Sequence, residues 1–375
     1  MYERAILHLD MDAFFASIEC LRNTSLNRGP LIIGGSGNRG VVASCNYIAR
    51  KFGVHAGMPV RMALQRCPDA VVLKGDMDTY SRYSKTITEI IESEAPEFEK
   101  SSIDEFYLDL TGMDKHIGCW KWGNELKNKL VHEVGLPISF GLSINKLVSK
   151  VGTGEAKPDG KIQIAQGNEK SFLAPLPVRK MPGIGNVQNR KLGMMGVRTI
   201  QTLSEIPPKL LQREFGETGI SFWKKANGID DSPVIPYREK KSISTEQTFQ
   251  MDTIDVTQLK SIIATMISKL GFELRNSKQL TSCITVKIRY TDFNTYTMQK
   301  KITYTANDKT LSKYAYQLFE KLYQRRQLVR LVGVKMSHLV NGNYQINLFD
   351  DTLKEIRLME QMDKIKKRFG TKVFK

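Results

Sequence analysis

The sequence lacks any apolar run long enough to cross a bilayer, and its first residues do not resemble a signal peptide. Its five cysteines are scattered and include no C-x-x-C pair, which argues against a zinc site or a disulfide framework. Internal repeats and low-complexity segments are also absent. We therefore expect a folded, cytoplasmic protein with reduced thiols and no membrane partner.

Acidic residues are few compared with basic ones. The chain has 39 Asp and Glu against 56 Lys and Arg, which gives a formal net charge of +17. Such an excess suggests a polyanionic partner, most often nucleic acid, although a generically basic protein is the simpler alternative. A length of 375 residues suggests two or more domains.

One group of acids follows a short apolar run near the N-terminus. Residues 5–9 predict a buried strand that ends at Asp10, with Asp12 in the following turn. A carboxylate at the end of a buried strand costs free energy unless it meets a cation or a hydrogen-bond donor. Either aspartate could instead cap the helix that Ser17 opens, so this stretch alone leaves both interpretations open.

A second group of acids favours the functional interpretation. Asp104 and Glu105 are neighbours in a strand-like stretch, so both can reach one point only if the backbone turns or bulges. Carboxylates brought together raise one another's pKa unless divalent cations neutralise them. Oxygen ligands suit Mg²⁺ or Mn²⁺, and two such ions roughly 3.5–4 Å apart catalyse in-line attack at phosphorus.

Five sequence blocks occur in one order along most of the chain. They are DMDAFF at 10–15, NYIARKFGV at 46–54, SIDEFYLD at 102–109, AKPDG at 156–160 and PGIG at 182–185. In residue types and order they resemble the Y-family of translesion DNA polymerases, in particular its DNA polymerase IV branch. The resemblance implies a bacterial, nucleoid-associated and monomeric enzyme of low fidelity and low processivity. Such an enzyme adds deoxynucleotides to a primer 3′ end and copies past damaged template bases.

The fold predicted from this resemblance is a multidomain right hand of the α/β and α+β classes. It has a mixed-sheet palm, small fingers, a helical helix-hairpin-helix thumb and a βαββαβ little finger. The expected boundaries are residues 1–18 and 75–173 for the palm, 19–74 for the fingers, 174–235 for the thumb, 236–242 for a linker, 243–342 for the little finger and 343–375 for a clamp-binding peptide with a basic tail.

The resemblance assigns the catalytic residues. Asp10, Asp104 and Glu105, together with the Met11 carbonyl, would hold two Mg²⁺ ions, with Mn²⁺ as an alternative. Whether Asp12 is catalytic or structural stays open. Phe15, next to Phe14 in the nucleotide site, would be the steric gate beneath the sugar.

Four further residues would bind the triphosphate of the incoming nucleotide. Tyr47 and Arg50 lie three residues apart on an expected helix and so share a face, and Ser44 precedes them. Without the resemblance, an exposed Arg and a half-buried Tyr would be expected. Lys157 is the fourth residue. The run Gly-Thr-Gly-Glu at 152–155 departs from the family pattern, so the direction of the Lys157 side chain stays open, and a surface lysine before a Lys-Pro turn is the alternative.

Two regions are expected to bind DNA. Gly183 and Gly185 resemble a helix-hairpin-helix turn, whose backbone N–H groups bind phosphate without reading sequence. In the last domain we predict strands at 244–249, 282–291, 294–304 and 330–339 and helices at 256–276 and 310–325. The alternation along 284–291 puts Lys287 and Arg289 on a sheet face with no covering helix, which suits a phosphate backbone.

The residues after this domain suggest a protein partner. Gln345, Leu348 and Phe349 form a Gln-x-x-Leu-Phe motif that resembles the peptide with which bacterial polymerases bind the sliding clamp. A strand end with Leu and Phe packed inward is the alternative. Residues 353–369 predict a helix of unknown role.

Two other classes of protein remain to be weighed. A nucleotidyl cyclase also has a palm with paired acids, but it leaves the basic C-terminal half and Gly183 unexplained. An accessory DNA-binding protein explains the charge but not the three acids. A primer-extension assay with and without Mg²⁺ would separate these possibilities.

Overall fold

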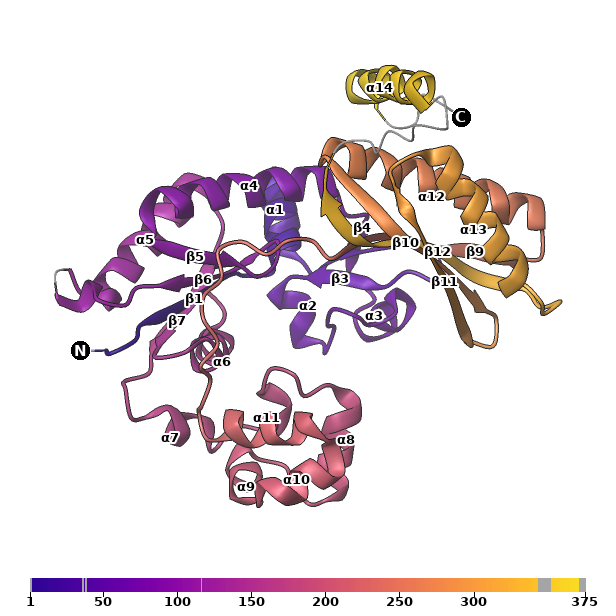
Figure 1. Ribbon diagram of the computed structural model, residues 1–375. Coiled ribbons are helices and arrows are strands. Elements are labelled where there is room, and N and C mark those ends of the chain that lie inside the picture. The colour runs from indigo at the N-terminus through magenta and orange to yellow at the C-terminus, as the bar shows by residue number, and fades with distance from the viewer. Residues whose placement is uncertain (1, 36, 38, 116, 343–351, 371–375) are drawn as a thin grey trace. The chain divides into compact units, whose positions relative to one another are not determined.

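The computed structural model describes residues 2–35, 37, 39–115, 117–342 and 352–370. It divides into two compact units, Met1–Arg238 and Glu239–Lys375 (Figure 1). The division lies within the predicted linker, 236–242, and the boundaries of the smaller domains stay predictions. Among the described residues, no helix is both long and apolar enough to cross a membrane.

The first unit is built on a five-stranded sheet in the order β5-β6-β1-β7-β8. Its strands are β5 (Glu97–Lys100), β6 (Glu105–Asp109), β1 (Ile6–Met11), β7 (Ile138–Ser143) and β8 (Lys161–Gln163). The central strand β1 is antiparallel to both of its neighbours, and its Asp10 lies directly opposite Glu105 of β6. The predicted buried strand therefore delivers Asp10 next to the second group of acids.

Helices cover both faces of this sheet. The helices that precede residue 186 are α1 (Phe14–Arg22), α2 (Tyr47–Lys51), α3 (Val60–Arg66), α4 (Met77–Glu94), α5 (Cys119–Val134), α6 (Lys146–Ala156) and α7 (Glu169–Leu173), with 3-10 turns η1 (Thr24–Arg28), η2 (Met113–Lys115) and η3 (Val178–Lys180). Figure 1 shows α4 and α5 on one side and α6 on the other.

Successive side chains of β1 point to opposite faces of the sheet. Leu7 and Leu9 point into the apolar core shared with α4 and α5. His8 faces α6, where its Nδ1 lies 2.9 Å from the Thr153 hydroxyl oxygen. Asp10 is two residues further along the strand and so lies on the same face as His8. The carboxylate thus leaves the sheet on the α6 side rather than on the apolar side.

A second, three-stranded sheet follows the first part of the chain. Its order is β3-β2-β4, with β2 (Leu31–Gly34), β3 (Val42–Cys45) and β4 (Val71–Leu73). The turn between β2 and β3 depends on glycine, because a Cβ on Gly40 would lie 2.0 Å from the Gly35 carbonyl oxygen. This small sheet, with α2 and α3, has its own apolar core.

Four helices make up residues 186–226: α8 (Asn186–Met194), α9 (Ile200–Glu205), α10 (Pro208–Phe215) and α11 (Glu217–Ala226). Their core includes Leu192, Leu203 and Phe222. Gly219 lets α11 approach α10 closely, since a Cβ there would lie 2.1 Å from the Leu211 carbonyl oxygen.

The second unit contains a four-stranded antiparallel sheet in the order β11-β10-β12-β9. Its elements are β9 (Ser242–Thr253), α12 (Val256–Asn276), β10 (Gln279–Tyr290), β11 (Thr295–Thr305), α13 (Asp308–Leu322), β12 (Val329–Asn341) and α14 (Thr352–Phe369). Both long helices α12 and α13 pack on the face that carries Ile284, Val286 and Ile288. The predicted element order and the predicted alternation are thus observed.

Candidate active site

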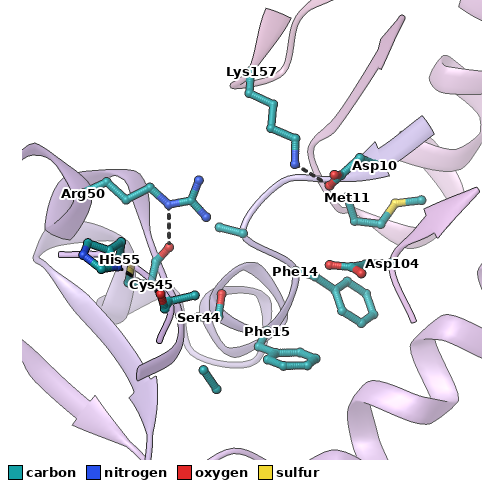
Figure 2. A pocket seen from close by; sticks show the side chains of 13 residues that line it. Asp10, Met11, Phe14, Phe15, Ser44, Cys45, Arg50, His55, Asp104 and Lys157 are labelled. Carbon is teal, nitrogen blue, oxygen red and sulfur yellow. Dashed lines mark hydrogen bonds and ion pairs between the residues drawn. The ribbon is translucent and has the colours of Figure 1, made fainter. Parts of the chain in front are cut away.

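One pocket of the first unit gathers most of the predicted catalytic and nucleotide-binding residues (Figure 2). It encloses about 470 Å³, within the range usual for small-molecule sites. It is lined by Asp10, Met11, Ala13, Phe14, Phe15, Ala43, Ser44, Cys45, Arg50, His55, Ala56, Asp104 and Lys157. Of the predicted catalytic and nucleotide-binding residues, Glu105 and Tyr47 do not line it.

The backbone at the end of β1 brings Asp10 and Asp104 together. The Met11 N–H donates to the Asp104 carbonyl at 3.1 Å. Ala13 then adopts a left-handed conformation with φ 47°, so that α1 can begin at Phe14 directly after the strand. A strand end and a sharp turn thus place two carboxylates and two aromatic rings around one pocket.

Ser102 forms the turn that was predicted at Asp104. Its hydroxyl donates to the Asp104 carboxylate at 2.5 Å. The same oxygen accepts the N–H groups of Asp104 and Glu105, at 3.2 and 3.0 Å. These bonds turn the chain just before β6, so that Asp104 points into the pocket while Glu105 begins the strand.

Lys157 reaches the active-site acids directly. Its Nζ forms an ion pair with the Asp10 carboxylate (Figure 2). The same Nζ lies 3.8 Å from the Asp12 carboxylate. The helix α6 continues through Gly152 and Gly154, so the unusual run at 152–155 remains helical. Burial raises the pKa of Asp10 to about 7, Lys157 opposes that shift, and the charges of Glu105 and Asp104 add to it.

Asp12 is fully buried and has its own hydrogen-bond donors. It accepts bonds from the Tyr47 hydroxyl at 3.1 Å, the Ser139 hydroxyl at 2.7 Å and the Asp159 N–H at 2.7 Å. These bonds join β1, α2, β7 and the chain after α6. The arrangement supports the structural alternative for this residue.

Arg50 and Tyr47 share one face of α2, as their spacing predicts. The Arg50 guanidinium carbon lies 4.5 Å from the centre of the Tyr47 ring, and its Nε donates to the Cys45 carbonyl at 3.3 Å. Burial and the neighbouring Asp12 raise the pKa of Tyr47, so its hydroxyl stays protonated and donates to Asp12. Arg50 and Ser44 face the pocket, whereas the Tyr47 hydroxyl is turned toward Asp12.

Phe15 forms one wall of the pocket and is supported from behind. Its half-buried ring stacks on Tyr80 with 4.5 Å between centroids and 14° between planes. The Tyr80 hydroxyl donates to Glu19 at 2.8 Å, which fixes that ring in turn. Phe14 also lines the pocket but is buried in the core.

Glu105 is held by a different lysine. The Lys150 Nζ lies 2.6 Å from the Glu105 carboxylate. Within residues 2–342 and 352–370, apart from the undescribed positions 36, 38 and 116, no three His, Cys, Asp or Glu residues form a group that could hold a metal ion. The structure therefore brings Asp10 and Asp104 to the pocket and keeps Glu105 beside it. Chemically the donors fit Mg²⁺, because all of them are oxygens.

Of the predicted DNA-binding residues, Gly183 and Gly185 are exposed, whereas Lys287 and Arg289 are half-buried. Gly183 has φ 97° in the turn before α8, and Gly185 caps that helix. Lys287 and Arg289 lie on the face of β10 opposite the helices, where Lys287 pairs with Glu246 of β9. The predicted clamp-binding residues Gln345, Leu348 and Phe349 lie outside the described residues.

Sequence reasoning missed several residues of this site. His55, Cys45 and Ala56 line the pocket from the segments around β3 and α2, and no motif marks them. Lys150 could have drawn attention because it follows Lys146 by one helical turn. Its partner, however, lies 45 residues away in sequence, and nothing local indicates that contact.

Three family models match the chain and together cover most of it. The model described as the impB/mucB/samB family matches residues 9–154, and its C-terminal domain matches 240–348. A model described as the thumb domain of DNA polymerase iota matches residues 179–230.

Relatives match over nearly the full length. A DNA polymerase IV of Dehalococcoides mccartyi is 34% identical over 98% of this chain and 95% of its own length. A DNA polymerase IV of Streptococcus pyogenes is 36% identical over 92% of this chain and 96% of its own length. A solved Y-family DNA polymerase chimera of Dbh and Dpo4 is 26% identical, with a TM-score of 0.80 over 90% of this chain and 100% of its own. The chain therefore belongs to the Y-family of DNA polymerases, in the DNA polymerase IV group, and is an enzyme of low-fidelity translesion DNA synthesis.

Proposed function

We propose that the pocket between Asp10 and Asp104 is the nucleotidyl-transfer site, where a deoxynucleotide joins the primer 3′ end. The observation that carries this proposal is the meeting of two carboxylates with Arg50, Lys157 and an aromatic wall in one pocket. The acids can hold cations, and the basic side chains of Arg50 and Lys157 suit a triphosphate.

Catalysis in this family is metal-dependent. We assign the ions as two Mg²⁺, with Mn²⁺ as an alternative, held by Asp10, Asp104, Glu105 and the Met11 carbonyl. When bound, such ions lower the pKa of the 3′ hydroxyl and stabilise the pyrophosphate that departs. The raised pKa of Asp10, caused first by burial and then by the nearby charges of Glu105 and Asp104, is consistent with this assignment, because a bound cation would favour the ionised carboxylate.

The triphosphate would lie between α2 and the end of α6. Arg50 offers a planar guanidinium and Lys157 an ammonium, while Ser44 adds a hydroxyl at the pocket wall. To bind the triphosphate, Lys157 must leave Asp10, whose charge the cation then compensates. Tyr47 would contribute by stacking beneath Arg50 and by donating its hydroxyl once that group is free of Asp12.

The sugar of the nucleotide would rest on Phe15. That ring is held by its stack on Tyr80, so a 2′ hydroxyl would meet a wall that cannot easily retreat. We therefore assign Phe15 as the steric gate that selects deoxynucleotides.

Primer–template DNA and a nucleotide are the substrates of this enzyme. We assign the phosphate contacts to Gly183 and Gly185 before α8 and to Lys287 and Arg289 on the open face of β10. We also expect a monomer that works at the bacterial nucleoid in the cytoplasm. For the sliding clamp, replacing Leu348 and Phe349 by Ala should abolish clamp-stimulated synthesis. Unchanged stimulation would contradict that assignment.

Primer extension by an Asp104→Asn variant tests the active-site proposal. The variant keeps the size of the side chain but loses its charge, so extension should fall by at least about a hundredfold while primer–template binding persists. Asp109→Asn is the matched control, since it changes an acid at the far end of β6, the strand that Asp104 precedes. Extension by Asp104→Asn at the wild-type rate would refute the proposal.

A further inference from the structure

Three lysines along and just after α6 pair with three acids of the central sheet. Lys146 lies 2.6 Å from Glu99 of β5, and Lys150 lies 2.6 Å from Glu105 of β6. Lys157 pairs with Asp10 of β1. The helix α6 and the residue that follows it thus present an ammonium to an acid on each of three neighbouring strands.

The first of these ion pairs is built as a permanent contact. The side chains of Lys146 and Glu99 are only 11% and 10% exposed. Glu99 also accepts the Ile235 N–H at 2.9 Å, and the Lys146 ammonium lies over the ring of Tyr107. Breaking this pair would leave buried groups without partners, which is costly.

The pair of Lys150 with Glu105 is more open to exchange. The two side chains are 32% and 23% exposed, so water reaches both of them. Pairs that solvent reaches contribute little net free energy and can exchange partners readily. This contact can therefore yield to a competing cation at small cost.

The register of the sheet makes such an exchange geometrically simple. Asp10 and Glu105 are directly opposite each other on antiparallel strands, so their side chains leave the same face. Nevertheless Asp10 lines the pocket and Glu105 does not. A rotation of the Glu105 side chain, without any change in the backbone, would bring its carboxylate toward Asp10.

We propose that Lys150 is a positioning residue that holds the Glu105 carboxylate beside the pocket and releases it when divalent cations bind, so that Glu105 can then coordinate them. This inference rests on the proposed function of the pocket. In the absence of cations, Asp10 and Asp104 then line the pocket while Glu105 stays paired with Lys150. The complete set of three carboxylates forms only when cations arrive.

The test is the affinity of the protein for Mn²⁺ without DNA or nucleotide, measured by electron paramagnetic resonance of the free ion. A Lys150→Met variant keeps an unbranched side chain of nearly the same length but has no ammonium to hold Glu105. We expect it to bind Mn²⁺ roughly 3- to 10-fold more tightly than the wild type. Lys150→Arg, which keeps the ion pair, should bind like the wild type.

A double-mutant cycle separates release of Glu105 from simple loss of a positive charge. In a Glu105→Gln background there is no third carboxylate to release, so Lys150→Met should change Mn²⁺ affinity by less than about twofold. An equal gain in both backgrounds would overturn the proposal, and so would no gain in either. If Lys150→Met does not give a cooperative thermal transition, Lys150→Gln takes its place in the same cycle.

These measurements also distinguish the proposal from the function on which it rests. Suppose that Lys150→Met does not raise Mn²⁺ affinity as predicted, but Asp104→Asn abolishes primer extension. That result would reject the role of Lys150 alone. If instead the Mn²⁺ affinities follow the prediction but Asp104→Asn extends primers normally, the assignment of the pocket would be rejected.

Discussion

At the scale of single residues, the stack of Phe15 on Tyr80 predicts how the enzyme selects its sugar. Phe15→Val would shorten the wall, while the Tyr80 hydroxyl can still donate to Glu19 of α1. We expect the kcat/KM ratio of ribonucleotide to deoxynucleotide to rise at least about tenfold, because a steric exclusion is removed. Single-nucleotide incorporation kinetics with matched dNTP and rNTP pairs would measure it.

A Tyr80→Phe variant is the control for that experiment. It removes the hydroxyl that donates to Glu19 but keeps the stacked ring behind Phe15. Its sugar selectivity should match the wild type. An unchanged ratio in Phe15→Val would show that another residue excludes the 2′ hydroxyl.

Replacing Asp12 should reduce the stability of the fold rather than remove a group that takes part in the reaction. In Asp12→Ala, the Tyr47 and Ser139 hydroxyls and the Asp159 N–H lose their acceptor inside the protein. Leaving such donors unpaired should lower the free energy of unfolding by roughly 2–4 kcal/mol. Urea denaturation would measure this, with Asp104→Asn as a variant expected to unfold near the wild-type midpoint.

At the scale of elements, the glycines near α6 have opposite roles. A Cβ on Gly141 of β7 would lie 2.4 Å from the Ser149 carbonyl oxygen, so this glycine lets α6 pack against the sheet. Gly154 is within α6, exposed, and has nothing within 4 Å of a Cβ added there. The first glycine is therefore required by packing, whereas the second only costs helix stability.

Replacing each of these glycines by alanine should change stability in opposite directions. Gly154→Ala should raise the free energy of unfolding by about 0.5–1 kcal/mol and keep activity. Gly141→Ala should lower it by about 2–3 kcal/mol and reduce extension, since α6 carries Lys150 and leads to Lys157. Thermal and urea denaturation of the two variants would measure these changes in the free energy of unfolding. Equal effects would contradict this account of how α6 is positioned.

At the scale of the whole molecule, the net charge of +17 should appear as salt-dependent binding to DNA. Removing Lys287 and Arg289 together should reduce the slope of log affinity against log salt by about 1 per side chain. Fluorescence anisotropy with a primer–template at several NaCl concentrations would measure the slope.

Lys313→Ala provides the control for the salt experiment. Lys313 is exposed on α13, which covers the apolar side of the same sheet. Its removal changes the net charge but should leave the slope nearly unchanged. Equal effects of the two sites would mean that the open face of β10 has no special part in binding.

The matches to known proteins also decide between the classes of protein considered for this chain. The family, the fold class and the polymerase activity predicted from five short blocks are confirmed. The nucleotidyl cyclase and the accessory DNA-binding protein are excluded, because the matches extend through the thumb-like helices and the C-terminal domain.

The sequence by itself determined the features that depend on local pattern. Alternation along residues 284–290 predicted which face of β10 is apolar, and the paired acids at 104 and 105 predicted a turn. These patterns are visible because strand period and turn chemistry act over a few residues.

Only the tertiary structure decided which charged groups meet. Three contacts join distant segments: Lys157 pairs with Asp10, Lys150 pairs with Glu105, and Tyr47 donates to Asp12. Such contacts arise from the register of β1 with β6 and from the packing of α6 on β7. Neither is encoded in the spacing of the residues along the chain, because burial and partner choice follow from the whole fold.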